Sequence, residues 1–126
     1  MAVLKFRALT ERVIGLAIEV HRMTGPGLLE SFYTECLCAE LEEAGIPFAS
    51  EVTIAVVYKS RPIPIGFGAD IVVDGSIMLE IKAVGSLLTA KESQILTYLH
   101  TSGISVGLLM NFHAKLLKDG LMRFVV

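Results

Sequence analysis

The chain has 126 residues, the usual length of one domain, and 53% of them are apolar. Its formal net charge of −2 excludes a protein that coats nucleic acid through a strongly basic surface. Any contact with nucleic acid must use a local basic face, a bound metal ion, or both. The high apolar fraction predicts a well-filled core and is compatible with a further surface buried in a homodimer.

Two helices are predicted in the first third of the chain. Thr10 provides a helix start, and the apolar pattern after it predicts a helix that ends near Thr24. Gly25-Pro26-Gly27 breaks this helix, and a second helix is expected from about Leu28 to Ala44. The predicted inner face of the second helix consists of Leu29, Phe32, Tyr33, Cys36, Leu37 and Leu41.

Three strands are predicted next, at residues 52–58, 67–73 and 77–83. A turn is expected at residues 59–61, and Pro62 and Pro64 predict an irregular edge before the second strand. Asp74-Gly75 predicts a type I′ hairpin turn between the second and third strands. If this turn is a two-residue loop, Val73 pairs with Ser76.

The remaining elements are a helix at residues 89–101 and strands at residues 104–112 and 121–126. The run at 104–112 is almost continuously apolar, as is typical of a buried central strand. The complete order predicts a single α+β or α/β domain, spanning residues 1–126, in which helices flank one mixed sheet.

Sequence features also bear on location. The only cysteines, Cys36 and Cys38, are two residues apart in a predicted helix, so they suit neither a disulfide nor a shared metal. The range Ser93–Ala114 has no formal charge, but its many polar side chains exclude a membrane span. Met1–Lys5 lacks the apolar core of a signal peptide. We therefore expect a cytoplasmic protein without membrane association.

Three charged residues, Asp70, Glu80 and Lys82, lie within apolar strands, where charge is costly unless it is paired or bound to metal. Glu80 and Lys82 project from the same face, because they are two residues apart. In the expected register Asp70 lies opposite Leu79 and diagonal to Glu80, and a twist or bulge could bring both carboxylates onto one ion. Such oxygen ligands favour Mg²⁺ or Mn²⁺. A structural ion pair is the alternative interpretation of these three residues alone.

The spacing of these charges resembles a known signature. Asp70, nine intervening residues, Glu80, one residue and Lys82 are similar to the motif of the PD-(D/E)XK nuclease superfamily. Ala69 stands where that motif often has proline, a position that varies in the superfamily.

Two further motifs extend the resemblance to the range from about Leu9 to Phe124. The heptapeptide Gly27–Tyr33 resembles the motif that names the GxxExxY proteins, a branch of the same superfamily. The pentapeptide Gln94–Tyr98 resembles the QxxxY motif of RecB-like nucleases.

The resemblance implies a restriction-endonuclease-like core and a metal-dependent nuclease that acts on DNA more readily than on RNA. The implied catalytic residues are Glu30, Asp70, Glu80, Lys82 and Gln94. Asp70 and Glu80 would bind Mg²⁺, for which Mn²⁺ can substitute, with the Ile81 carbonyl and Glu30 as further ligands. Lys82 would position or activate the attacking water, and Gln94 would reach back to the metal. Tyr98 would lie beside Gln94, close to the substrate.

Two other functions fit the same sequence. A nucleic-acid or protein binding module could keep this fold without turnover, as the acidic net charge suggests. A subunit that acts only with a partner is the other alternative, as the small size suggests.

Overall fold

The computed structural model describes residues 6–86 and 89–126, and its elements follow the predicted order. They are α1 (Arg7–Thr24), α2 (Glu30–Glu43), β1 (Phe48–Tyr58), β2 (Arg61–Val73), β3 (Ile77–Lys82), α3 (Thr89–Ser102), β4 (Val106–Asn111), the 3₁₀ helix η2 (Leu117–Gly120) and β5 (Leu121–Val125). No helix within the described residues is both long and apolar enough to cross a bilayer. Met1–Lys5, from which we predicted the lack of a signal peptide, lie outside the described residues.

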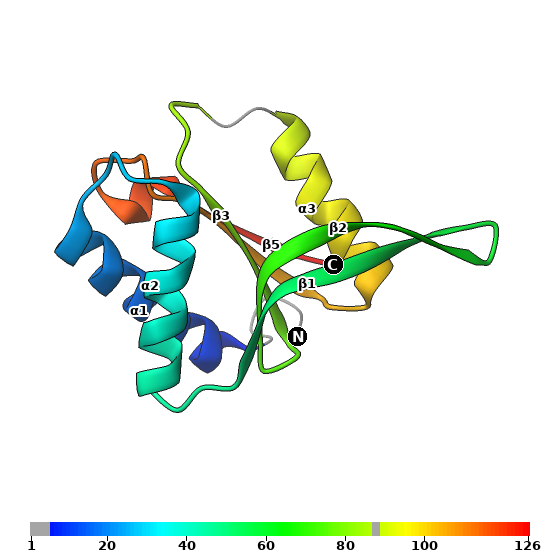
Figure 1. The fold of residues 1–126 in the computed structure, drawn as a ribbon, viewed down its shortest axis with the longest axis horizontal. Helices are drawn as coiled ribbons and strands as arrows, with labels where there is room; N and C mark the ends of the chain where they lie inside the picture. Colours follow the sequence, from blue (N-terminus) through cyan, green and yellow to red (C-terminus); the bar gives the residue numbers. More distant parts are fainter. Residues whose placement is uncertain (1–5, 87–88) are drawn as a thin grey trace.

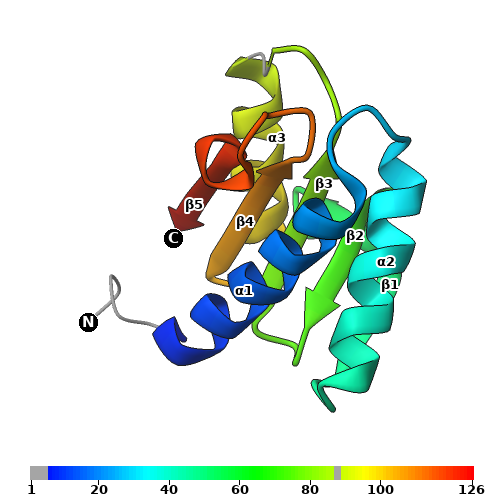
Figure 2. The same ribbon diagram turned by 90° about the vertical axis from the view of Figure 1, so that its left-hand side faces the viewer.

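The five strands form one sheet in the order β1-β2-β3-β4-β5. Strands β3 and β4 are parallel, and the other neighbouring pairs are antiparallel. Helices α1 and α2 cover one face of the sheet, and α3 covers the other (Figures 1 and 2). The predicted mixed sheet flanked by helices is therefore confirmed.

Each face of the sheet carries its own hydrophobic core. Leu79 and Ile81 of β3 pack into the core beneath α1 and α2, whereas Met78 packs with Ile95 and Leu99 of α3. Every residue of β4 is buried, as expected for a central strand. Because side chains alternate along a strand, the next residues on the Met78 face of β3 are Glu80 and Lys82.

Both N-terminal helices differ from the prediction at their starts. Helix α1 begins at Arg7, and Thr10 is buried within it instead of opening it. Helix α2 begins at Glu30 and follows Leu29, which is 76% exposed although it was predicted to be buried. Phe32 is also exposed, at 48%. The buried residues of α2 are Tyr33, Leu37 and Leu41, which recur every fourth residue and form the side that faces the sheet. Phe32 lies beside this side of the helix.

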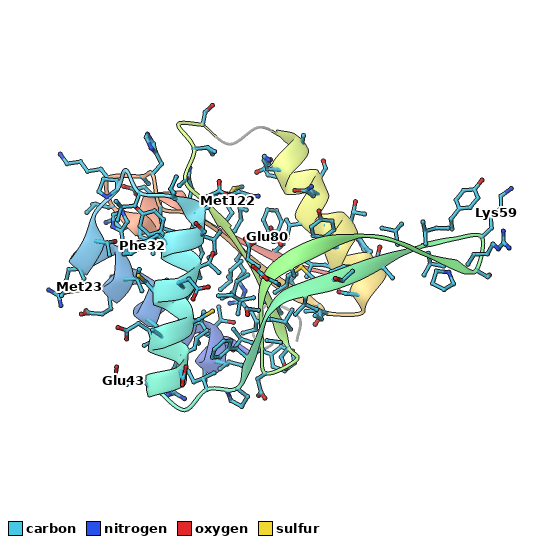
Figure 3. The ribbon with its side chains drawn as sticks, viewed as in Figure 1. Met23, Phe32, Glu43, Lys59, Glu80 and Met122 are labelled. Carbon is cyan, nitrogen blue, oxygen red and sulfur yellow. The ribbon has the colours of Figure 1, made fainter. Side chains whose placement is uncertain are left out.

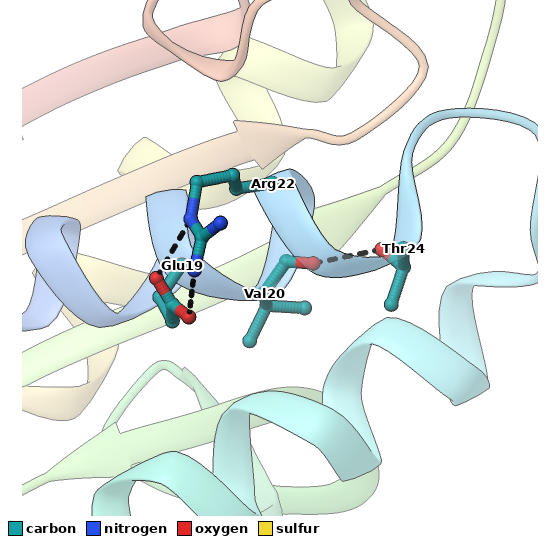
Figure 4. Close-up of polar contacts among 4 residues, drawn as sticks. All are labelled: Glu19, Val20, Arg22 and Thr24. Atoms are coloured by element: carbon teal, nitrogen blue, oxygen red, sulfur yellow. Dashed lines mark hydrogen bonds and ion pairs between the residues drawn. The ribbon is translucent and has the colours of Figure 1, made fainter.

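The end of α1 is held by local hydrogen bonds (Figure 4). Arg22 donates to both carboxylate oxygens of Glu19, at 2.7 and 3.1 Å, and the Thr24 hydroxyl donates to the Val20 carbonyl at 2.8 Å. Gly25 then adopts φ 73°, a left-handed conformation in which glycine is favoured. The predicted break after Thr24 is thus confirmed.

The hairpin between β2 and β3 shows a register shifted by one residue from the prediction. Asp74 and Gly75 both have positive φ, as a type I′ turn requires, and the Ser76 N–H donates to the Val73 carbonyl. However, Val73 pairs with Ile77, so Ser76 is an extra residue in the loop. The predicted pairing of Val73 with Ser76 was therefore wrong. In the observed register Asp70 lies across from Glu80.

The first hairpin is longer than predicted. Strand β1 begins at Phe48, β2 begins at Arg61, and Pro62 pairs with Val57. The irregularity expected at the prolines is confirmed, because the pairing of β1 with β2 shifts register between the Ile54–Phe67 pair and the Val56–Ile63 pair. Strand β3 does not reach this end of β2. Pro62 therefore has no ladder partner on that side and loses nothing by lacking an N–H.

Candidate metal centre

Asp70 and Glu80 lie where β2 and β3 begin to separate. The last paired residues of these strands are Ile71 and Leu79, and the next pair in the same register would be Asp70 and Glu80. There, Asp70 Oδ2 accepts the backbone N–H of Ile81 at 2.7 Å. In a continuous antiparallel ladder, a main-chain carbonyl of β2 would accept this N–H. Here the Asp70 carboxylate accepts it instead, and the backbones of β2 and β3 move apart at this point.

The Ile81 carbonyl faces the same opening. The N–H and C=O groups of one strand residue point to the same side of the strand, and the Ile81 N–H points to Asp70. The Lys82 carbonyl faces β4 instead, because it accepts the N–H of Phe112. Two carboxylates and one main-chain oxygen are therefore directed toward one region.

Glu80 is a buried carboxylate with an unsatisfied oxygen. The residue is 4% exposed, and its Oε1 is buried and accepts no hydrogen bond from the described residues. Its Oε2 lies 4.0 Å from the Lys82 Nζ. Burial, and then the negative charge of Asp70, raise the pKa of Glu80 to about 7. Lys82 and the Asp70 backbone lower this pKa but do not offset the burial.

The charged form of Asp70 is also disfavoured by its surroundings. Burial raises its pKa above the ordinary aspartate value, and the charges of Glu30 and Glu51 raise this pKa further. The Ile81 N–H and the Lys82 ammonium act in the opposite direction. Since removing a charge from water is costly unless it is compensated, this cluster of carboxylates favours binding of a cation.

Glu30 joins the site from the opposite helical layer. It is the first residue of α2, where the helix dipole favours a negative charge, and its Oε2 accepts the Ala83 N–H at 3.3 Å. Glu30 and Asp70 also line one pocket of about 240 Å³. The structure therefore brings Glu30 to the end of β3, close to Lys82, which precedes Ala83 in the chain.

Glu51 is a site residue that the sequence did not reveal. It lies between Ser50 and Val52, whose partners in β2 are Ile71 and Ala69, and thus stands across from Asp70. It has a positive φ of 52° and lines the same pocket as Glu30 and Asp70. The strand was predicted to begin only after Glu51, so the sequence offered no signal that placed it beside Asp70.

Tyr98 and Gln94 approach from α3. Tyr98 is 4% exposed, and its pKa is raised to about 12 by burial and then by the charges of Glu80 and Asp70. Tyr98 therefore lies close to both carboxylates. Gln94 is partly buried one helical turn earlier, on the side of α3 that also carries Tyr98. A contact between Gln94 and a metal ion stays a prediction.

The donor set fits a hard divalent cation with water in its remaining positions. Among residues 6–86 and 89–126, no group of three or more His, Cys, Asp or Glu side chains is arranged to hold a metal by itself. Mg²⁺, however, commonly uses one or two protein carboxylates and completes its shell with waters and substrate phosphates. Asp70, the unsatisfied Oε1 of Glu80 and the Ile81 carbonyl meet that requirement.

A comparison with protein families supports this interpretation. The family model described as the PD-(D/E)XK nuclease superfamily matches residues 7–124, which include all the candidate site residues. The mixed sheet between helical layers agrees with a restriction-endonuclease-like core. Comparisons with curated proteins and with solved structures gave no match. Membership of the GxxExxY branch stays a prediction. The chain belongs to the PD-(D/E)XK nuclease superfamily.

Proposed function

We propose that this protein is a metal-dependent nuclease that hydrolyses phosphodiester bonds in DNA, with Mg²⁺ as its cofactor and Mn²⁺ as a substitute. The observation that carries the proposal is the pair of facing carboxylates, Asp70 and Glu80, in which a buried oxygen of Glu80 lacks a partner among the described residues. Membership of a nuclease superfamily supports nucleic acid as the substrate. A purely structural ion pair would leave no reason for that unsatisfied oxygen.

The proposed metal ligands are Asp70, Glu80, the Ile81 carbonyl and Glu30. Asp70 is also fixed by its hydrogen bond from Ile81, which holds its second oxygen in place. Glu30 is tied to the Ala83 N–H through one oxygen, so its other oxygen is available for the ion or for a water bound to it. When bound, the ion would supply positive charge to the phosphate and lower the pKa of a bound water.

Lys82 is the proposed positioning group for the attacking water. Its ammonium lies beside Glu80 at 4.0 Å and its side chain is 15% exposed, so it is oriented by the site. An ammonium there orients the water and stabilises the charge that develops on the phosphate. The water oxygen forms the new bond to phosphorus, the bond from phosphorus to O3′ breaks, and O3′ takes up a proton. The products are a 5′-phosphate and a 3′-hydroxyl.

Residues of α3 complete the proposed site. Gln94 would reach the ion or its waters, and Tyr98 forms a buried wall next to Glu80 and Asp70. A wall of this kind excludes bulk water from one side of the carboxylates, which strengthens their attraction for a cation. Beyond the site, we propose a cytoplasmic location. A homodimer could bury the exposed apolar side chains of Leu29 and Phe32.

The test is a cleavage assay on labelled single-stranded, duplex, flapped and four-way DNA and on RNA, with Mg²⁺ and with Mn²⁺. We expect metal-dependent cleavage of DNA and weaker cleavage of RNA. If folded protein that binds Mn²⁺ cuts none of these substrates, the proposal is wrong. A binding module or a partner-dependent subunit would then be favoured.

A further inference from the structure

The first hairpin carries an arm that projects from the domain. We call residues 55–63, the distal part of the β1–β2 hairpin, the hairpin arm. Ile54 is buried in the core beneath α3, and the register of the hairpin shifts between Ile54 and Val56. Beyond this shift the two strands continue past α3 without a covering layer (Figure 1). Val57 and Tyr58 are 56% and 60% exposed.

The arm is basic, although the chain as a whole is acidic. No Asp or Glu occurs from Val52 to Ala69, and Lys59 and Arg61 are the only charged residues in that range. Lys59 lies in the turn at the end of the arm, Arg61 directly follows the turn, and both are exposed. A tip with two positive charges, on a protein of net charge −2, is electrostatically complementary to a polyanion.

The tip also offers an aromatic surface. The Lys59 ammonium lies 5.5 Å from the centre of the Tyr58 ring. Lys59 and Ser60 both have positive φ, which fixes a tight turn at the end of the arm. Figure 3 shows Lys59 at the far end of the hairpin, well separated from Glu80. Cations beside an exposed ring suit contacts to phosphates and to sugars or bases.

We propose that the hairpin arm holds double-stranded DNA at a distance from the cleavage site, with Lys59 and Arg61 on phosphates and Tyr58 inside a groove. This inference rests on the proposed nuclease function. A two-stranded β ribbon has the width that the major groove of B-DNA admits. Duplex DNA also presents the continuous line of phosphates that a second, distant contact requires.

Strand β1 gives the separation between the two contacts, because the register shift leaves two extra residues in β2. Glu51 lies across from Asp70 and Tyr58 pairs with Arg61, so seven residues of β1 span the distance. At about 3.3 Å per residue in a strand, this separation is about 23 Å, or about seven base pairs at a rise of about 3.4 Å. The arm therefore needs about seven base pairs of duplex on one side of the scissile phosphate.

The experiment measures binding, so that its outcome does not depend on catalysis. Fluorescence anisotropy in Ca²⁺ gives the affinity for duplexes of about 8 to about 24 base pairs as a function of salt. Relative to wild type, Lys59→Ala with Arg61→Ala should weaken binding to long duplexes about tenfold. It should also lower the slope of log affinity against log salt by about 2, since each phosphate contact contributes about 0.9. The matched control, Arg12→Ala with Lys118→Ala, removes the same charge from other exposed positions and should bind like wild type.

Tyr58→Ala should weaken binding without changing the salt slope, because the ring carries no charge. An arm variant whose affinity and slope equal those of wild type overturns the proposal, and so does a wild type that binds no duplex. The arm variant could also change the mass of the protein in solution without changing its DNA affinity. That result would show that the arm contacts a second copy of the chain, and it would overturn the proposal too. The nuclease proposal is judged separately by cleavage, so a protein that cuts DNA but shows no arm effect fails only this inference.

Discussion

The Asp70 carboxylate accepts the backbone N–H of Ile81 across the gap where β2 and β3 separate, at 2.7 Å. This single contact fixes one carboxylate oxygen of Asp70, a proposed metal ligand. It also aligns the Ile81 carbonyl with the carboxylates, because the carbonyl shares the orientation of the N–H. Strand separation and ligand placement therefore have the same structural cause.

Asp70→Asn should reduce Mn²⁺ affinity at least tenfold while the fold is kept. The amide oxygen can still accept the Ile81 N–H, but the charge that attracts the ion is lost. Isothermal titration calorimetry checks this, with Asp74→Asn as the matched control. Asp74 is an exposed turn residue with φ 50°, a conformation that asparagine tolerates. Equal Mn²⁺ affinity in Asp70→Asn and wild type would remove Asp70 from the metal site.

Lys82→Ala should separate catalysis from metal binding. Because the proposed role of Lys82 is to act on the water and the phosphate, single-turnover cleavage should fall about 100-fold or more. Mn²⁺ affinity should change little, since an ammonium is not a metal ligand. The exposed Lys118→Ala variant serves as the control and should cleave at the wild-type rate. Parallel losses of Mn²⁺ affinity and cleavage in Lys82→Ala would instead make Lys82 a structural partner of Glu80.

The metal-free protein should lose stability as the pH rises from 4.5 to about 7. In this interval the unfolded chain releases the Glu80 proton while the folded chain retains it, because the folded pKa is raised from 4.5 to about 7. The cost should be absent below pH 4.5 and constant above pH 7, at about 3 kcal/mol. Urea unfolding at several pH values measures it. Glu80→Gln should lack the part of this dependence that Glu80 causes and keep only that of Asp70, whose pKa is also raised. A Glu80→Gln profile parallel to that of wild type would contradict the account.

Tyr33→Phe should destabilise the loop between α1 and α2. The buried Tyr33 hydroxyl donates to the Gly25 carbonyl at 2.6 Å and accepts the Leu28 N–H at 3.1 Å. Its loss leaves both main-chain groups without this partner, at a cost of about 1–3 kcal/mol. Urea unfolding checks this value against the exposed control Tyr58→Phe, which should stay within about 0.5 kcal/mol of wild type. Equal stability of Tyr33→Phe and wild type would show that the hydroxyl does not fix the loop.

The GxxExxY-like motif has a structural explanation in this loop. Gly27 adopts φ 99°, Glu30 accepts the Ala83 N–H, and Tyr33 stacks on Phe112 with ring centres 4.5 Å apart. The sequence identified all three motif positions through a family resemblance. The resemblance implied Glu30 as a metal ligand, and the structure brings Glu30 to the candidate metal centre. The sequence did not reveal that Gly27 and Tyr33 position the loop.

The order of elements could be predicted because helical and strand periodicities are local properties of the sequence. The register between β2 and β3 could not, because one extra loop residue, Ser76, leaves the turn signal of Asp74-Gly75 unchanged. That single residue decides whether Asp70 faces Leu79 or Glu80. Glu51 was missed for a related reason, since its place across from Asp70 depends on where β1 begins.

The central claim, that Asp70 and Glu80 hold the metal for phosphodiester cleavage, is tested most directly by single-turnover cleavage of a labelled duplex by Glu80→Gln. The control is Glu42→Gln, an exposed substitution in α2. We predict that wild type and the control cleave at equal rates with Mg²⁺, and that Glu80→Gln is folded but at least 100-fold slower. Wild-type cleavage by Glu80→Gln would contradict the account, as would cleavage by wild type that is unchanged when EDTA replaces Mg²⁺.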